Sequence, residues 1–234
     1  ELKDVAQKTT QGNVTGFAMC CLQNEEGTFN FTPWLWSTGA TSYDINNDNG
    51  IKALTLVKDL VDAGSMSKEV INWTQGDVMN QFISGNIAMM VNGPWQVPTM
   101  REQAPDLNWD VTLLPKDAEY ASCLGGENFG VIDGDNVDAA LDFLQFATSK
   151  DEVASYIDDF GYIAARKDVA EGQFTDDETM QKFTEEMQYA QPRGPHAQWP
   201  EISDALSLAV NESITGTSAP ADAAAKAQST IDGI

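Results

Sequence analysis

Apolar residues follow two patterns in the first two thirds of the chain. Dense apolar runs at 14–23 and 86–91 are rich in Val, Met, Ile and Ala, which is typical of buried strands. Shorter apolar runs at 109–115 and 123–132 predict two further strands. Elsewhere apolar residues recur at helical spacing, and the predicted helices are 1–10, 50–63, 74–84, 95–103 and 136–148. Asn49 can cap the second of these helices.

The rest of the chain comprises an aromatic stretch and a helical end. Residues 24–50 are rich in Gly, Asn and aromatic side chains without strong periodicity, so we expect mostly loop. From Asp151 onward the pattern is helical, and the predicted helices are 151–161, 176–190, 200–216 and 220–234. Pro200 at a first helical position and Gly216 just past an end mark one of them. Strands alternating with helices indicate an α/β sheet with helices on its faces.

The charge balance excludes some classes of function. The chain has 36 acidic and 13 basic residues, a formal net charge of −23. Such a chain repels phosphate backbones and anionic lipid headgroups, so we expect no nucleic-acid partner. With 42% hydrophobic residues, the 234 residues can bury a sizeable core. No window approaches the roughly 18 consecutive apolar residues that span a bilayer.

Residues that bind metals or form cross-links are scarce. The three cysteines, Cys20, Cys21 and Cys123, form no C-x-x-C pair, and the single histidine is His196. We therefore expect no metal site and no cofactor. The thiols are either buried as small hydrophobic side chains or joined in one disulfide between Cys123 and Cys20 or Cys21.

Motifs for catalysis are equally scarce. The chain has no G-x-S-x-G, P-loop or H-E-x-x-H motif, and a Ser-His-Asp triad would depend on His196 alone. Residues 44–50 approximate a calcium loop but have no acidic residue to close it. The adjacent Glu25 and Glu26 lie in the expected loop and could equally face solvent, so an acid pair of the glycosidase type stays open.

Tryptophans gather at the ends of the expected elements. Five of the six stand beside Gly, Pro, Asn or Gln: Trp34, Trp36, Trp73, Trp95 and Trp199. An indole face can stack on the C–H face of a pyranose while nearby amides and carboxylates bind its hydroxyls. This placement favours sugar recognition over the alternative that the rings only pin loops to the core.

Several segments together carry a family pattern. Residues 80–95 read NQFISGNIAMMVNGPW; a helical segment at 50–64 precedes them, and LGGENFGVI at 124–132 and GYIAARKDV at 161–169 follow. In this order, and with the two C-terminal helices, they resemble the extracellular solute-binding proteins of carbohydrate ABC transporters, the class that includes maltose-binding protein. The first segment resembles the F-x-x-G-x-x-A-M-x-x-x-G-x-W pattern of that family.

The resemblance implies an α/β, periplasmic-binding-protein-like fold whose two lobes close on a sugar. On that plan residues 1–155 form most of the C-terminal lobe, 156–205 a helical return segment toward the N-terminal lobe and hinge, and 206–234 the closing helices. Most of the N-terminal lobe would be absent. We therefore expect that an N-terminal portion, with any leader, has been removed.

The resemblance also implies a ligand site without catalytic residues. Trp95 matches the family's stacking tryptophan after NGP, and Glu127 and Asn128 fit its polar loop, where Gly125 and Gly126 permit close approach. The complete set implied to contact ligand is Trp34 or Trp36, Trp73, Gln75, Trp95, Glu127, Asn128 and Trp199.

The resulting hypothesis is a receptor, not an enzyme. It would capture a mono- or oligosaccharide, act as a monomer and deliver the ligand to the permease subunits of an ABC transporter. We expect it outside the cell, lipid-anchored on a Gram-positive surface, with the periplasm as the alternative. The rival hypotheses are a glycan-processing enzyme that uses a carboxylate pair and an interaction domain whose aromatic residues are purely structural.

Overall fold

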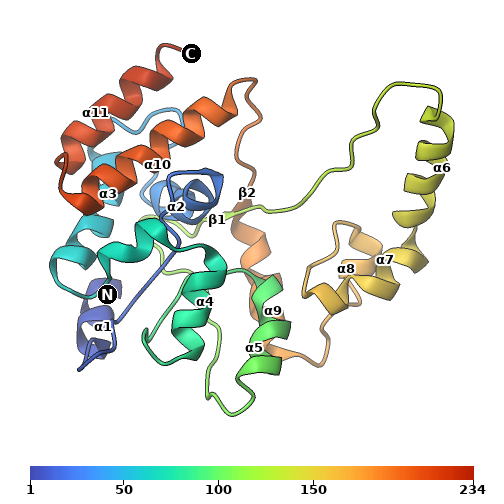
Figure 1. Cartoon of the computed structure of the whole chain (residues 1–234), viewed down its shortest axis with the longest axis horizontal. Coiled ribbons are helices and arrows are strands. Elements are labelled where there is room, and N and C mark those ends of the chain that lie inside the picture. Colours follow the sequence, from blue (N-terminus) through green and yellow to red (C-terminus); the bar gives the residue numbers. More distant parts are fainter. The chain divides into compact units, whose positions relative to one another are not determined.

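The structure, a computed structural model, describes residues 1–234 and consists mainly of helices (Figure 1). The helices are α1 (Leu2–Thr9), α2 (Glu25–Ser37), α3 (Asp48–Asp62), α4 (Gln75–Ile83), α5 (Val97–Gln103), α6 (Val137–Ala147), α7 (Lys150–Tyr156), α8 (Lys167–Ala170), α9 (Glu178–Glu186), α10 (Trp199–Thr215) and α11 (Pro220–Ile231). Short 3-10 helices are η1 (Lys68–Asn72), η2 (Pro94–Gln96), η3 (Asp158–Phe160) and η4 (Met187–Tyr189). Strands β1 (Ser122–Cys123) and β2 (Ala190–Gln191) pair in parallel. No helix has the length and apolar character that crossing a membrane requires.

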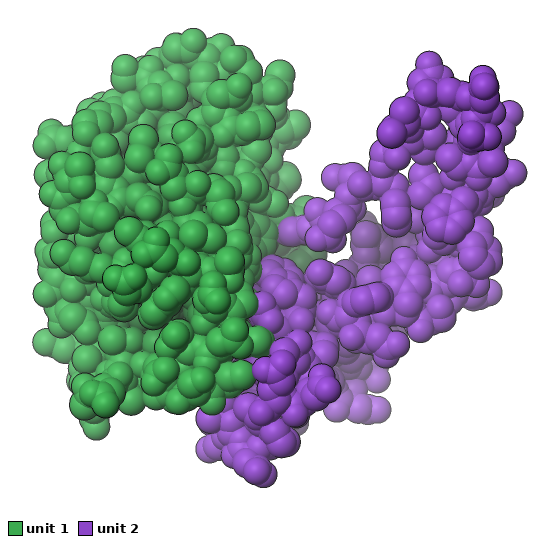
Figure 2. All heavy atoms as spheres, viewed as in Figure 1, with its two compact units in different colours: residues 1–92, 113–124, 186–234 green, residues 93–112, 125–185 purple.

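The chain divides into two compact units, coloured separately in Figure 2. Unit 1 comprises residues 1–92, 113–124 and 186–234, and unit 2 comprises residues 93–112 and 125–185. The expected boundary at 155 falls inside unit 2, and residues 186–205 belong to unit 1. The correspondence between these units and the lobes of the expected fold stays a prediction.

Helix α10 forms the centre of unit 1. It packs against α11, α2 and α3 (Figure 1). Ile202, Leu206 and Ile214 on its inner face are almost completely buried, whereas Leu208 is 39% exposed. This spacing is the apolar stripe of an amphipathic helix, so the sequence pattern correctly placed α10 and its neighbour α11.

The strands predicted at 14–23 and 86–91 lie side by side in unit 1 as extended segments. Thr15 pairs with Ile87 and Ala18 with Met90, both in parallel, although the pairing is too short to form a continuous ladder. The Ala18 amide donates to Met89 O at 2.9 Å, and Val91 N donates to Ala18 O at 3.0 Å. The parallel arrangement agrees with the expected α/β class.

The expectation of a loop over 24–50 was wrong, because residues 25–37 form α2. Asn24 caps this helix by accepting hydrogen bonds from Glu26 N at 3.0 Å and Gly27 N at 3.2 Å. Gly27 allows close backbone approach, since a Cβ at this position would lie 1.9 Å from Leu22 O. Pro33 and the aromatic residues are weak helix formers, and burial of most of the helix compensates for them.

Two further expectations need smaller corrections. The N-cap of α3 is Asn47 rather than Asn49, and its side chain accepts from Asn49 N and Gly50 N. The strands predicted over 109–115 and 123–132 are absent apart from Cys123, the second residue of β1. Residues 125–136 are exposed, so their apolar alternation has no neighbouring strand with which to pair.

Unit 2 is mostly helical and has a small core. Val153, Ala164 and Val169 are buried together, and Tyr156 and Ile157 pack against them. An ion pair also joins α5 to the turn before α9. The Arg101 guanidinium donates two hydrogen bonds, of 2.7 and 2.8 Å, to the Asp177 carboxylate. This bidentate geometry is the favourable one for an arginine–carboxylate pair.

Candidate functional site

The residues expected to contact ligand are divided between the two units. Unit 1 contains Trp34, Trp36, Trp73, Gln75 and Trp199, and unit 2 contains Trp95, Glu127 and Asn128.

Trp34 and Trp36 lie in the core of unit 1 rather than in a loop. They are 6% and 8% exposed. The Trp34 ring meets Phe17 edge-on, with ring centroids 5.9 Å apart, and the Trp36 indole N–H donates to Ser42 Oγ at 3.0 Å. Both side chains stabilise α2 against the body of unit 1.

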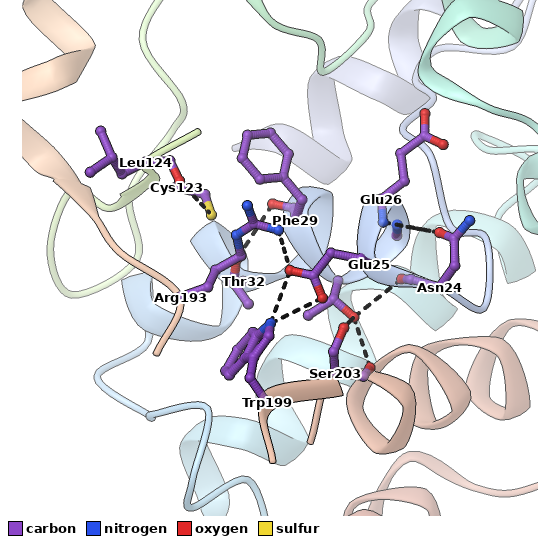
Figure 3. A network of polar contacts seen from close by, with 12 residues as sticks. Asn24, Glu25, Glu26, Phe29, Thr32, Cys123, Leu124, Arg193, Trp199 and Ser203 are labelled. Atoms are coloured by element: carbon purple, nitrogen blue, oxygen red, sulfur yellow. Dashed lines mark hydrogen bonds and ion pairs between the residues drawn. The ribbon is translucent and has the colours of Figure 1, made fainter. Parts of the chain in front are cut away.

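Trp199 lies at a surface cleft of unit 1, at the first residue of α10 (Figure 3). The cleft has a volume of about 590 Å³, and its lining residues are Gln23, Asn24, Glu25, Arg193, Trp199, Pro200, Ser203 and Asp204. The N-terminal ends of α2 and α10 thus meet here. Helix N-termini carry partial positive charge and favour acidic and electron-rich groups.

A carboxylate fixes the edge of the Trp199 ring. The indole Nε1 donates to both oxygens of Glu25, at 3.0 Å each. The Arg193 guanidinium forms an ion pair with Glu25 Oε1 and lies over the Phe29 ring, 4.7 Å from its centroid (Figure 3). The bonds to Glu25 are made through the edge of the indole, and the half-buried ring also packs against the core of unit 1.

The roles of Glu25 and Arg193 were not predicted from the sequence. Glu25 was expected in a loop, whereas it is the first residue of α2, directly after the cap Asn24. The signal was the N-cap residue followed by two acids, which is typical of a helix N-terminus. Arg193 follows β2, and nothing local in the sequence relates it to a residue so distant in the chain.

Residue Gln75 belongs to a second polar group of unit 1, at the N-terminus of α4. Its backbone N–H donates to Glu26 Oε1 at 2.6 Å, and its carbonyl accepts from Asn92 Nδ2 at 2.8 Å. Its side-chain Oε1 is buried without a hydrogen-bond partner. Trp73, just before the cap Thr74, packs against the core.

The three cysteines are free. Burial raises the pKa of the Cys20 thiol to about 12 and that of Cys123 to about 11, and it raises the pKa of Cys21 well above its ordinary value. Arg193 lowers the Cys123 pKa, but less than burial raises it. All three are therefore protonated at neutral pH and are poor nucleophiles. No group of three or more His, Cys, Asp or Glu residues is arranged to hold a metal ion.

In unit 2, Trp95 belongs to an aromatic group. Its ring centroid lies 6.2 Å from that of Tyr162, and Tyr162 lies 6.4 Å from Phe160. Glu127 and Asn128 are exposed in the extended stretch before α6. Gly126 before them has φ of 140°, which favours glycine.

Comparison with known proteins identifies the family. A model of the bacterial extracellular solute-binding proteins matches residues 1–182. The chain belongs to this family. The expected resemblance is confirmed, and it classes the chain with binding proteins rather than enzymes.

Individual relatives agree with this assignment. A protein of Brucella abortus (strain 2308), described as a "Putative binding protein", is 26% identical over an alignment of 211 residues that covers 84% of this chain and 51% of that protein. The maltose-bound MalE3 of T. maritima has a TM-score of 0.85 at 22% identity, covering 99% of this chain and 64% of its own. An ABC transporter solute-binding protein from Thermotoga lettingae TMO, bound with α-D-tagatose, also has a TM-score of 0.85, at 25% identity, covering 99% and 63%.

These matches confirm the expected fold class. The chain is an α/β protein that corresponds to part of the two-lobe binding-protein fold. It spans about half the length of the curated relative and less than two thirds of the structural neighbours.

Proposed function

We propose that this chain is part of a receptor that captures a mono- or oligosaccharide between two lobes and delivers it to the permease subunits of an ABC importer. The observation that carries the proposal is Trp199, held by Glu25 at the mouth of a cleft in unit 1. Membership of the solute-binding family supports it, as do neighbours whose structures hold maltose and α-D-tagatose.

The chemistry of the cleft suits a polyhydroxylated ligand. An indole face offers an apolar platform to the C–H groups of a pyranose ring. Asn24, Asp204 and Gln23 place amide and carboxylate groups around it, and these can accept and donate to sugar hydroxyls at once. Trp95 in unit 2 supplies a second platform in this proposal, with Glu127 and Asn128 as polar contacts. Trp34 and Trp36 contribute indirectly, by fixing α2 and therefore Glu25.

Transport rests on a change of population rather than on chemistry. A ligand that contacts both lobes stabilises the closed form over the open form, and the permease distinguishes the two. The proposed receptor is a monomer without nucleic-acid partners, located outside the cell. A lipid anchor on a Gram-positive surface and a periplasmic location remain the two alternatives.

Calorimetric titration of the protein from the complete gene with maltose, maltotriose and tagatose tests this function. We expect at least one sugar to bind, and Trp199→Ala to weaken that binding tenfold or more, about 1.4 kcal/mol. Trp109→Ala, outside the candidate site, is the matched control and should leave the affinity unchanged. Absence of binding to every sugar, or an unchanged affinity in the folded Trp199 variant, would contradict the proposal.

The glycan-processing alternative is tested in the same samples. Chromatography of the oligosaccharide after prolonged incubation should recover it intact. Release of shorter products that requires Glu25 would instead favour the enzyme hypothesis, in which a carboxylate pair cleaves the glycosidic bond.

A further inference from the structure

Arg193 is the single basic residue among those that line the cleft around Trp199. Its side chain is only 20% exposed, although it lies in the connection between β2 and α10. Figure 3 shows that Arg193 and Trp199 both point toward the carboxylate of Glu25. The ion pair with Glu25 thus joins the one cation of the cleft to the hydrogen-bond partner of the indole.

The backbone before Arg193 is fixed independently of the arginine side chain. Strand β2 pairs in parallel with β1, and Gln191 lies opposite Cys123. Leu124 N donates to Gln191 O at 2.8 Å, and β1 contacts α2. A substitution of the Arg193 side chain therefore leaves intact the strand pairing that brings this part of the chain to α2.

The guanidinium contacts two residues on one face of α2. Glu25 and Phe29 are four positions apart, so their side chains are neighbours along the helix. The guanidinium pairs with the Glu25 carboxylate and lies over the Phe29 ring, 4.7 Å from its centroid. A planar guanidinium stacks on a ring and binds a carboxylate at the same time, whereas the ammonium of a lysine acts as a point charge. The arrangement therefore uses a property of arginine that lysine lacks.

Glu25 requires such a restraint if it is to orient Trp199. Its side chain is 46% exposed and has several rotatable bonds, so water competes for its oxygens. The two bonds from Trp199 Nε1, of 3.0 Å each, hold the carboxylate from one side only. Ion pairs this exposed contribute little to stability. The main effect of Arg193 is therefore on the orientation of the carboxylate rather than on the stability of unit 1.

We propose that Arg193 is a positioning residue of the cleft. It holds Glu25 in the orientation that accepts both bonds from the indole, and it does not contact the ligand itself. Packing against the core sets where the Trp199 ring lies, and the Arg193–Glu25 pair sets the direction of its N–H edge. The consequence for ligand binding rests on the proposed function, whereas the effect on the indole does not depend on it.

The indole N–H signal of Trp199 in NMR spectra tests this role. The protein is produced from the complete gene with nitrogen-15 label, and Trp199→Phe identifies the signal by its disappearance. We expect Arg193→Gln to shift the signal and to speed exchange of the indole proton with water by about tenfold or more. The unfolding temperature should stay within about 2 °C of the wild-type value.

Two further variants separate charge and stacking from a general effect of substitution. Arg193→Lys keeps the charge but not the stacking on Phe29, so it should give an intermediate exchange rate. Arg166→Gln, which removes an ion pair with Asp168 in unit 2, is the matched control and should leave the Trp199 signal unchanged.

A double substitution tests whether Arg193 acts through Glu25. Glu25→Ala removes the carboxylate, and Arg193→Gln added to it should increase the exchange rate no further, because the two residues act as one unit. With a sugar that binds the wild-type protein, Arg193→Gln should weaken the affinity by about threefold to tenfold and add nothing to the effect of Glu25→Ala.

Other results would overturn the proposal. An unchanged Trp199 signal in Arg193→Gln would show that the indole is fixed without the arginine. Shifts of all the tryptophan signals, with a large fall in the unfolding temperature, would show that Arg193 is a structural residue of unit 1. Additive effects in the double variant, or weaker sugar binding with an unchanged indole signal, would show that Arg193 acts on the ligand directly. If no sugar binds the wild-type protein, the proposed function fails, and the indole signal still decides whether Arg193 positions Trp199.

Discussion

The placement of Trp95 depends on the residue two positions before it. A Cβ built on Gly93 would lie 2.1 Å from Cη2 of the Trp95 ring, so the ring lies directly over the glycine backbone. The φ of Gly93 is −102°, a value that any residue adopts, so the requirement for glycine is one of space. Tyr162 contacts the same ring. The NGP sequence thus does more than turn the chain, because its glycine makes room for the indole.

Replacement of Gly93 by alanine tests this contact. We expect Gly93→Ala to displace the Trp95 ring, to lower the stability of unit 2 by about 1–3 kcal/mol and to shift the tryptophan emission. Gly76→Ala is the control, since its Cβ would meet nothing closer than Thr74 Oγ1 at 3.6 Å. In α4 this control should be neutral or stabilising by up to about 1 kcal/mol. Equal stability of both variants in thermal unfolding would contradict the proposed overlap.

Individual site residues were only partly predictable from the sequence. Trp199 was predicted as a platform and does lie at a cleft. Its partner Glu25 was expected in a loop, either facing solvent or as one member of an acid pair, and not as a partner of the indole. Trp34 and Trp36 stand beside Pro33, which suggested a loop, yet both are buried in a helix. Neighbours in sequence indicate local conformation, whereas burial is decided by α10 and other distant elements.

At the scale of elements, two leucines that lie close together on α10 allow the effect of burial on stability to be compared directly. Leu206 is fully buried among α2, α3 and α11, and Leu208 is 39% exposed. We expect Leu206→Ala to lower the free energy of unfolding by about 2–5 kcal/mol, since it leaves a cavity in the core. Leu208→Ala should change it by about 0.5 kcal/mol or less. Urea unfolding of both variants measures the difference, and similar losses would mean that α10 is not the centre of the core.

The contribution of the Arg101–Asp177 ion pair to the stability of unit 2 depends on pH. Hydrogen bonds from Arg101 lower the pKa of Asp177, and those same bonds raise the pKa of Arg101. A carboxyl with a lowered pKa contributes stability above its unfolded pKa of about 3.9, and this contribution is lost as the pH falls through the folded pKa.

Arg101→Gln should therefore destabilise unit 2 at neutral pH by about 0.5–1 kcal/mol, because the arginine is about half exposed. The difference from the wild-type chain should shrink as the pH falls below about 3.9. Lys182→Gln, which removes a 3.4 Å pair with Glu185, is the control and should have little effect. Amide exchange in α5 and α9 measures the change, and a loss that persists at acid pH would show that packing of the arginine stem is responsible.

Elements with strong local signals were predicted well, and those that need distant partners were not. Helices α3, α4, α6, α10 and α11 follow apolar stripes and clear end signals, and all were expected near their observed bounds. Strands at 109–115 and 123–132 were expected and not found, because a strand exists only where a neighbour provides its hydrogen bonds. In unit 2 that neighbour is absent for residues 129–132.

At the scale of the whole molecule, two properties stand out together. The chain covers 51–64% of the length of its relatives, and one of its two units has a core of only a few residues. Its negative charge far exceeds its positive charge over the same residues. We therefore expect the stability of the chain as a whole to depend most strongly on two conditions: how completely the fold is formed, and how well the excess negative charge is screened.

Screening can be tested alone by changing the ionic strength. Raising sodium chloride from 0.01 to 1 M shortens the Debye length from about 30 Å to about 3 Å, which removes most of the repulsion among the excess carboxylates. The ion pairs are largely exposed and lose little by comparison. We expect the unfolding temperature to rise by several degrees, since about 1 kcal/mol corresponds to about 2–4 °C for a chain of this size. Potassium chloride at the same ionic strength should have the same effect, because screening does not depend on the identity of the cation. A falling unfolding temperature would mean that the ion pairs outweigh the net charge of −23 in the folded state.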